Sequence, residues 1–318
     1  MLTDTILEIR DIRKHFEAGK GRTVKSLDGI TISIKKGETF GLVGESGSGK
    51  STFGRTIAGL YKATSGEVLF EGKNVANFSN KEIREYNKKM QMIFQDPQAS
   101  LNPRMKVGDI IAEGIDAYKL LKGKERQERI YELLEKVGLN KEHAERFPHE
   151  FSGGQRQRIG IARAIALNPT FIVADEPISA LDVSIQAQVI NLLEDLQRDG
   201  DLTYLFIAHD LAMVKHISDR IGVMYLGKMM ELTGSSELFE DPLHPYTQTL
   251  MSAIPVSNPK LRGTKERTKL TGEPPSPLTP PSGCPFQTRC PKAMEICASL
   301  PPEWKEVKKE HWISCHLF

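Results

Sequence analysis

One stretch of the sequence has residue types and spacing that suit phosphate chemistry. It fits the pattern G-x-x-x-x-G-K-[ST], in which glycines let successive backbone amides face phosphate oxygens. The stretch consists of Gly44, Glu45, Ser46, Gly47, Ser48, Gly49, Lys50, Ser51 and Thr52. The apolar run 39–43 precedes it, which predicts a loop between a strand and a helix that starts near Lys50. We expect Lys50 to reach nucleotide phosphates and Ser51 to ligate Mg²⁺. A glycine-rich turn with a chance lysine is the alternative.

Two carboxylates follow a second apolar run. Residues 171–174 lead directly into Asp175 and Glu176. At the end of a strand, Asp175 is suited to hold Mg²⁺ and Glu176 to polarise an attacking water. Capping of a following helix is the alternative for this pair, and the phosphate-binding pattern upstream favours the chemical interpretation.

A third segment predicts an exposed helix start. Ser152 and Gln155 form an S-x-x-Q capping box, and Gly153 and Gly154 between them allow another backbone or ligand to approach closely. The free amides at such a helix N-terminus offer a second place for a phosphate. Capping boxes also occur on plain surface helices, as we expect at Ser79.

The elements that position these residues alternate between strands and helices. Ile30, Ile32 and Ile34 alternate with polar residues, as in a half-buried strand. Short apolar runs predict strands, and spaced apolar residues predict helices. The expected strands are 39–43, 170–174, 203–208 and 221–226, and the expected helices include 107–121 and 125–137. This order predicts an α/β fold with a mostly parallel sheet and a helical insertion at about 98–165.

Composition excludes several classes of protein. With 39% hydrophobic and 26% charged residues, the chain is neither disordered nor fibrous. A formal net charge of +2 does not indicate a nucleic-acid-binding surface. No apolar run reaches the roughly 18–20 residues of a membrane span, and the N-terminus lacks the pattern of an export signal. We therefore expect a cytoplasmic chain whose membrane role depends on partners.

Taken together, these motifs resemble those of ATP-binding-cassette ATPases. The phosphate loop, Gln95, the Ser152–Gln155 signature, Asp175 with Glu176, Asp182 and His209 occur in that family's order and spacing. The resemblance implies a P-loop NTPase core with an antiparallel β subdomain and the helical insertion subdomain. It also implies that two cassettes close head to tail around ATP and Mg²⁺.

The resemblance further implies roles for single residues. Phe16 would stack on adenine, Gln95 would sense the γ-phosphate and Mg²⁺, and His209 would hold the γ-phosphate and attacking water. Asp182 and the signature Ser152, Gly153, Gly154 and Gln155 would face the nucleotide of the partner cassette. An aromatic residue at a strand end and a lone histidine are otherwise more often structural.

Longer segments resemble the ATPases of oligopeptide and dipeptide importers. They are residues 94–103, 149–155, 180–188, 242–247 and 272–277. The resemblance is strongest to the F-type subunit, which pairs with a D-type ATPase beneath two transmembrane permease subunits. It implies a peripheral position at the cytoplasmic face of the inner membrane, with an external peptide-binding protein acting indirectly. Nickel or sugar as cargo is the alternative within this group.

The end of the chain differs in composition. Thirteen of the 18 prolines lie from Pro242 onward, and all four cysteines lie in the last 35 residues. We therefore divide the chain into a nucleotide-binding domain, 1–254, and a proline-rich linker with a cysteine-containing extension, 255–318. Cys284, Cys290, Cys297 and Cys315 suggest a metal site. Related importer ATPases hold a [4Fe–4S] cluster in a similar tail, so a cluster ranks before zinc, and zinc before reduced structural thiols.

Two other functions compete with the importer ATPase. A soluble cassette ATPase acting on nucleic acid or ribosomes usually has two cassettes or a basic face, which this sequence lacks. A regulatory nucleotide binder without hydrolysis would not need Glu176 and His209. The sequence leaves the cargo open, because the cargo is not expected to touch this chain.

Overall fold

The computed structural model describes residues 4–19, 21–253 and 272–318. They divide into two compact units. Unit 1 contains the described residues of 1–34, 39–76 and 208–318, and unit 2 contains 35–38 and 77–207. The expected domain boundary at 254/255 lies outside the described residues, whereas the cysteine-containing tail from residue 272 onward belongs to unit 1.

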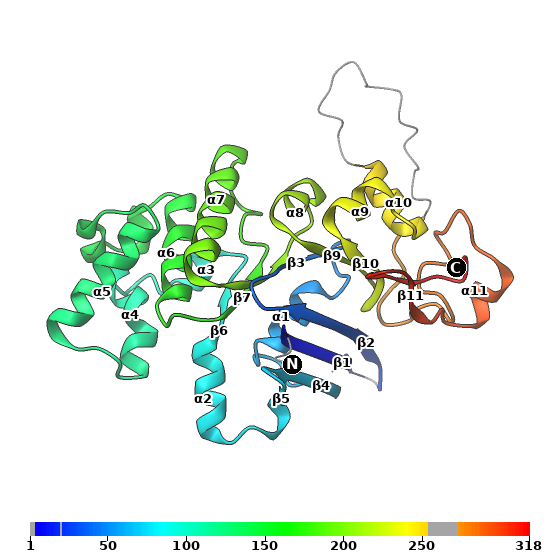
Figure 1. Ribbon diagram of the computed structural model, residues 1–318, viewed down its shortest axis with the longest axis horizontal. Coiled ribbons are helices and arrows are strands. Elements are labelled where there is room, and N and C mark those ends of the chain that lie inside the picture. The colour runs from blue at the N-terminus through cyan, green and yellow to red at the C-terminus, as the bar shows by residue number, and fades with distance from the viewer. Residues whose placement is uncertain (1–3, 20, 254–271) are drawn as a thin grey trace, which may run out of the picture. The chain divides into compact units, whose positions relative to one another are not determined.

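Unit 1 contains two groups of paired strands (Figure 1). An antiparallel sheet has the order β2-β1-β4-β5, with β1 Thr5–Glu17, β2 Thr23–Lys35, β4 Ser65–Phe70 and β5 Lys73–Asn74. The other strands have the order β11-β12-β10-β9-β3, with β3 Thr39–Val43, β9 Arg220–Tyr225, β10 Lys228–Gly234, β11 Trp304–Lys308 and β12 His311–Ser314. The pair β3 and β9 is parallel, and the pairs that follow are antiparallel.

The helices of unit 1 flank these strands. They are α1 Lys50–Ile57, α8 Leu211–Ile217, α9 Ser235–Glu240, α10 Pro245–Ser252 and α11 Glu295–Ser299. The core is apolar: every residue of β3 is buried, and Ile30, Ile32 and Ile34 of β2 point inward as their alternation predicts. Phe53 on α1 is also fully buried, so the helix that starts at Lys50 is packed firmly onto the strands.

Unit 2 combines three parallel strands with the helical insertion. The strands, in the order β8-β7-β6, are β6 Met90–Ile93, β7 Phe171–Asp175 and β8 Thr203–Ile207. The helices are α2 Asn80–Lys89, α3 Pro97–Ser100, α4 Val107–Ala117, α5 Gly123–Lys136, α6 Gly153–Ile165 and α7 Val183–Gly200. Short 3₁₀ turns occur at Lys141–Glu145 and Pro148–Glu150, and a further one, Val75–Asn77, begins in unit 1 and ends at the first residue of this part of unit 2. All residues of β7 and β8 are buried, as expected for parallel strands covered on both faces.

The predicted elements are confirmed with shifts at their ends. The helix expected over 107–121 ends at Ala117, because Lys119 adopts a left-handed backbone with φ 56°. The helix expected over 125–137 starts two residues earlier, at Gly123, and ends where Gly138 takes φ 71° and donates its N–H to the carbonyl of Glu135. The capping box at Ser79 is present and starts a surface helix, α2.

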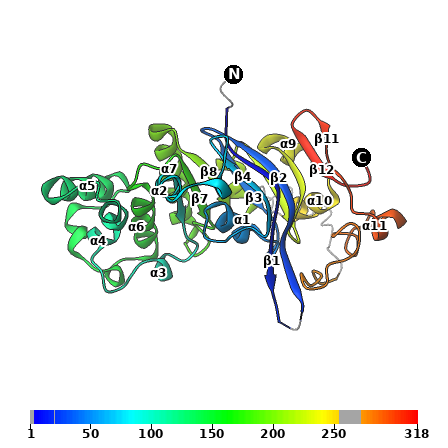
Figure 2. The ribbon, with the colours of Figure 1, turned by 90° about the horizontal axis from the view of Figure 1, so that it is seen from below.

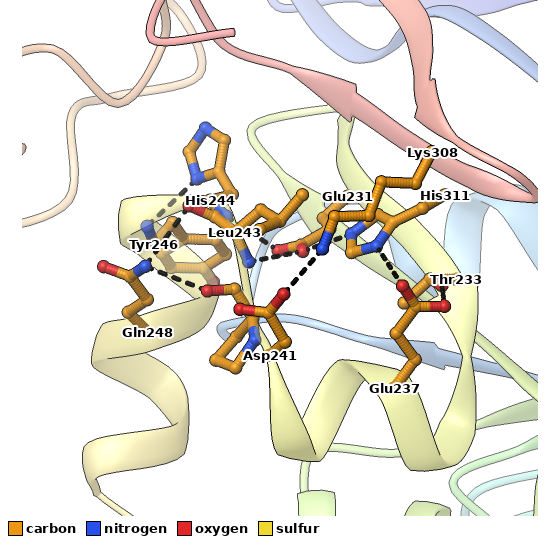
Figure 3. A network of polar contacts seen from close by, with 11 residues as sticks. Glu231, Thr233, Glu237, Asp241, Leu243, His244, Tyr246, Gln248, Lys308 and His311 are labelled. Carbon is orange, nitrogen blue, oxygen red and sulfur yellow. Dashed lines mark hydrogen bonds and ion pairs between the residues drawn. The ribbon is translucent and has the colours of Figure 1, made fainter.

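The tail extends the sheet of unit 1. Strand β12 pairs antiparallel with β10, and Figure 2 shows the hairpin β11–β12 beside α9. Figure 3 shows how this hairpin is attached. The carboxylate of Glu231, which is fully buried, accepts the backbone N–H groups of Leu243 and His244 and contacts Nε2 of His311 at 2.8 Å. His311 Nδ1 lies 3.1 Å from Glu237 of α9.

None of the helices in the described residues combines the length and the apolar character needed to cross a membrane.

Candidate functional site

The phosphate loop lies in unit 1, where it joins β3 to α1 as predicted. Two of its glycines are required by close contacts. A Cβ on Gly44, at φ 153°, would lie 2.2 Å from the carbonyl oxygen of Met224. A Cβ on Gly49, at φ 106°, would lie 2.3 Å from that of Ser26. Only glycine fits these positions, so the chain can curve tightly into α1.

Lys50 lies inside the curve of this loop. Its side chain is buried, and Nζ donates to the carbonyl oxygens of Gly44 at 2.8 Å and Glu45 at 3.0 Å. The hydroxyl of Ser48 is buried and has no hydrogen-bond partner among the residues that the structure describes. A buried ammonium and an unsatisfied hydroxyl at the N-terminus of a helix are groups that suit phosphate oxygens. The loop therefore fits the triphosphate that its sequence predicts.

Neighbouring strands brace the loop. Ser26 of β2 donates its hydroxyl to Thr52 Oγ1 at 2.9 Å, and the carbonyl of Ser48 accepts the N–H of Gly227 at 2.8 Å. A pocket of about 430 Å³ lies on the loop. It is lined by Glu45, Ser46, Gly47, Ser48, Tyr225, Leu226 and residues 273–277 of the tail.

Phe16 and His209 are the residues outside the phosphate loop that the sequence predicts for the nucleotide site of unit 1. Phe16, at the end of β1, is half-buried and packs edge-on against Tyr61, with ring centroids 5.5 Å apart. His209 is exposed and follows Ala208, whose N–H donates to Leu42 of β3. The chain thereby brings His209 next to the strand that leads into the phosphate loop.

In unit 2, β7 ends in the two predicted carboxylates. Asp175 is fully buried at the end of the strand. Glu176 follows with a left-handed backbone, φ 46°, which is unfavourable for a residue with a side chain and turns it away from the line of the strand. Gln95 Nε2 donates to Glu176 Oε2 at 2.8 Å. The structure thus joins two residues that the sequence separates by 81 positions.

The signature segment forms the predicted helix start. Ser152 caps α6: its hydroxyl accepts the N–H of Gln155, and the Gln155 side chain accepts the N–H of Ser152. A Cβ on Gly154 would lie 2.5 Å from the side chain of Ile185 on α7. Asp182 is the N-cap residue of α7, so the signature and Asp182 are brought together where α6 meets α7.

The four cysteines are free thiols in the tail of unit 1. The Cys284 N–H donates to the carbonyl of Cys297, and burial raises the pKa of Cys284 to about 11. Burial also raises the pKa values of Cys290 and Cys315. Within the described ranges, no group of three or more His, Cys, Asp or Glu side chains is arranged to hold a metal ion.

Two residues of the phosphate-loop region escape sequence analysis. Tyr246 of α10 accepts the N–H of Glu45 at 2.9 Å, and Arg289 of the tail pairs with the Glu45 carboxylate at 2.7 and 3.1 Å. Arg289 lies 244 residues from Glu45, and no periodicity links them. The sequence signal for Arg289 is limited to its place directly before Cys290, whereas Tyr246 lies in the segment 242–247 that resembles importer ATPases.

Comparison with known proteins places this geometry in a family. Residues 27–179 match the family described as ABC transporter, and residues 230–297 match the C-terminal region of oligopeptide/dipeptide transporters. The oligopeptide transport ATP-binding protein OppF of Bacillus subtilis is 57% identical over 99% of this chain and 97% of its own length. The chain belongs to the ABC transporter family. AppF of the same organism, also an oligopeptide transport ATP-binding protein, is 56% identical over 99% of this chain and 98% of its own length.

Solved structures of ABC proteins have the same fold. The ATP-binding cassette MJ0796, in a dimeric post-hydrolysis state bound to ADP and Pi, is 29% identical, with a TM-score of 0.65 over 72% of this chain and 98% of its own. The protein cbiO1 of Clostridium perfringens, part of the ABC transporter complex cbiONQ, is 27% identical. It has the same TM-score over 75% of this chain and 92% of its own. As an ABC ATPase with a complete phosphate loop, this chain binds Mg²⁺ and ATP and hydrolyses the nucleotide.

Proposed function

We propose that this chain powers the uptake of dipeptides and oligopeptides across the cytoplasmic membrane. One observation carries the proposal: an ABC cassette and the C-terminal region of oligopeptide/dipeptide transporters occur together in one chain, and full-length relatives share both. The cargo follows from this combination, because the phosphate loop alone is common to the whole family.

In the proposed reaction, Lys50 and the loop amides hold the triphosphate. Ser51, Gln95 and Asp175 would bind Mg²⁺. Glu176 accepts a proton from the attacking water. The water oxygen forms a bond to the γ-phosphorus while the bond to the β–γ bridging oxygen breaks, and ADP leaves with that electron pair. His209 holds the γ-phosphate and the water, and Phe16 stacks on adenine.

A second cassette completes the site in this proposal. The chain has one phosphate loop and one signature, so the Ser152–Gln155 segment and Asp182 serve the nucleotide of a partner ATPase. The proposed partner is a related, D-type subunit. Closure and reopening of the pair around ATP would drive two transmembrane permease subunits, with this chain bound at the cytoplasmic face of the inner membrane.

The proposal predicts that cargo stimulates ATP turnover in the assembled transporter. The two ATPases and the two permease subunits are reconstituted in vesicles, and phosphate release is measured with peptide, nickel or sugar, each with its binding protein. We expect stimulation by peptide only, and none in a Lys50→Ala variant. Stimulation by nickel or sugar alone would reassign the cargo. Phosphate release by the chain without the permease subunits is also measured with nucleic acid, and stimulation there would support the soluble class of ABC ATPase.

We also propose that the four tail cysteines bind an iron–sulphur cluster, with zinc as the alternative. The support is the cysteine pattern in the sequence. The described side-chain positions do not form a ligand set, so binding requires the four thiolates to converge. A cluster would staple a proline-rich segment that has little core of its own.

Anaerobic purification tests the metal directly. We expect a brown protein that absorbs near ~400 nm with about four irons per chain, and loss of both signals in a Cys297→Ser variant. A colourless protein with stoichiometric zinc would show that the cysteines bind zinc and not a cluster. Absence of both metals would show that the cysteines are structural thiols.

A further inference from the structure

Glu45, the second residue of the phosphate loop, is held by the C-terminal part of the chain. Its backbone N–H donates to the hydroxyl of Tyr246, and its carboxylate receives two hydrogen bonds from Arg289. Its carbonyl accepts from Lys50. Both α10 and the cysteine-containing tail therefore act on one residue of the loop.

The groups that hold Glu45 are buried and packed on each other. The Tyr246 side chain is fully buried and Arg289 is 7% exposed. Phe286 of the tail packs against Tyr225 and Tyr246, with ring centroids 5.4 and 5.2 Å away. Arg289 also donates to the hydroxyl of Tyr225 at 3.3 Å. This packing fixes the guanidinium, so that it can in turn fix the loop.

The charge of Glu45 explains why such an arrangement matters. A carboxylate in a phosphate loop repels a triphosphate, because like charges at short range raise the free energy of the bound state. The Glu45 side chain is 23% exposed, so water screens this repulsion only in part. A guanidinium paired in two-point geometry neutralises the carboxylate and keeps it in one place.

We propose that Arg289 is a positioning residue for ATP binding: the tail neutralises Glu45 and holds the phosphate loop in its ATP-accepting shape. The tail touches the loop at a second place, since residues 273–277 line the pocket on Glu45 to Ser48. This inference rests on the proposed role of the loop in holding ATP. It assigns the extension a function in the nucleotide site itself, separate from any metal.

The test is a double-mutant cycle on the full-length chain, with the variants Arg289→Gln, Glu45→Gln and the two changes combined. Affinity for a fluorescent ATP analogue is measured by titration, and folding by circular dichroism. Arg289→Gln leaves the Glu45 carboxylate unpaired, so we expect the dissociation constant to rise about tenfold, with an effect that weakens at high salt. Adding Glu45→Gln removes the repelling charge, and we expect this double variant to regain most of the lost affinity.

Two controls separate the possible outcomes. Lys308→Gln removes another ion pair of the tail, an exposed one with Asp241. We expect this variant to bind the ATP analogue like the parent. Lys50→Ala should lose binding; if it does not, the proposed role of the loop is wrong, whatever Arg289 does. A folded Arg289→Gln variant with unchanged affinity would overturn the inference, and so would a folded double variant as weak as the single. If Arg289→Gln alone does not fold, the double variant is compared with Glu45→Gln, and a folded double variant that binds about tenfold more weakly than Glu45→Gln would overturn the inference.

Discussion

Replacement of Glu176 by glutamine is expected to lower ATP turnover in the assembled transporter by about 10²–10⁴-fold, the usual contribution of a general base. Glutamine has nearly the same shape and can keep a hydrogen bond with Gln95, but it cannot accept the proton of the attacking water. ATP binding should persist, so the variant should accumulate with ATP bound. Phosphate release measures the first effect, and nucleotide retained after gel filtration measures the second.

The structure gives this prediction a specific reason. Glu176 occupies a left-handed backbone position directly after the buried β7, and such strain is kept where a side chain must point in a required direction. Glu135→Gln, an exposed change on α5 of the same unit, is the matched control and should not alter turnover. Unchanged phosphate release in the Glu176 variant would show that another group activates the water.

Local parts of the site could be predicted because neighbouring residues determine them. The loop from Gly44 to Thr52 is contiguous, and its glycines are required by contacts that the motif implies. The capping box of Ser152 and Gln155 spans three residues, so its two hydrogen bonds follow from the helix itself. Motif spacing thus carries most of the information on phosphate binding.

Features that depend on long-range packing could not be predicted. Apolar Leu120 and Leu121 extend the helical pattern past Ala117, but the left-handed Lys119 ends the helix and leaves Leu120 exposed. The contact of Arg289 with Glu45 joins segments that are 244 residues apart in the sequence, and the residues that flank each of them give no sign of this contact. Composition separates the tail from the cassette, whereas its strands extend the sheet of unit 1.

Replacement of His311 by glutamine is expected to destabilise the docked hairpin β11–β12 by about 3–5 kcal/mol near pH 6, as for a buried ion pair that loses one partner. Glu231 would remain as a buried carboxylate without the histidine that neutralises it. Both tryptophans of the chain, Trp304 and Trp312, lie in this hairpin, so denaturation followed by tryptophan fluorescence reports on it selectively.

The same pair makes the stability of the hairpin depend on pH. Burial lowers the pKa of His311, but its hydrogen bonds to Glu231 and Glu237 raise the pKa by more, to above the ordinary 6.5. This contribution is complete below pH 6.5 and is lost as the pH rises through the raised pKa. The hydrogen bond from His311 lowers the pKa of Glu237 below 4.5, so its contribution is lost only in more acidic solution. The difference between the parent and His311→Gln should therefore shrink from pH 6 to pH 9. A constant difference between the parent and His311→Gln over this pH range would mean that His311 is neutral in the folded chain.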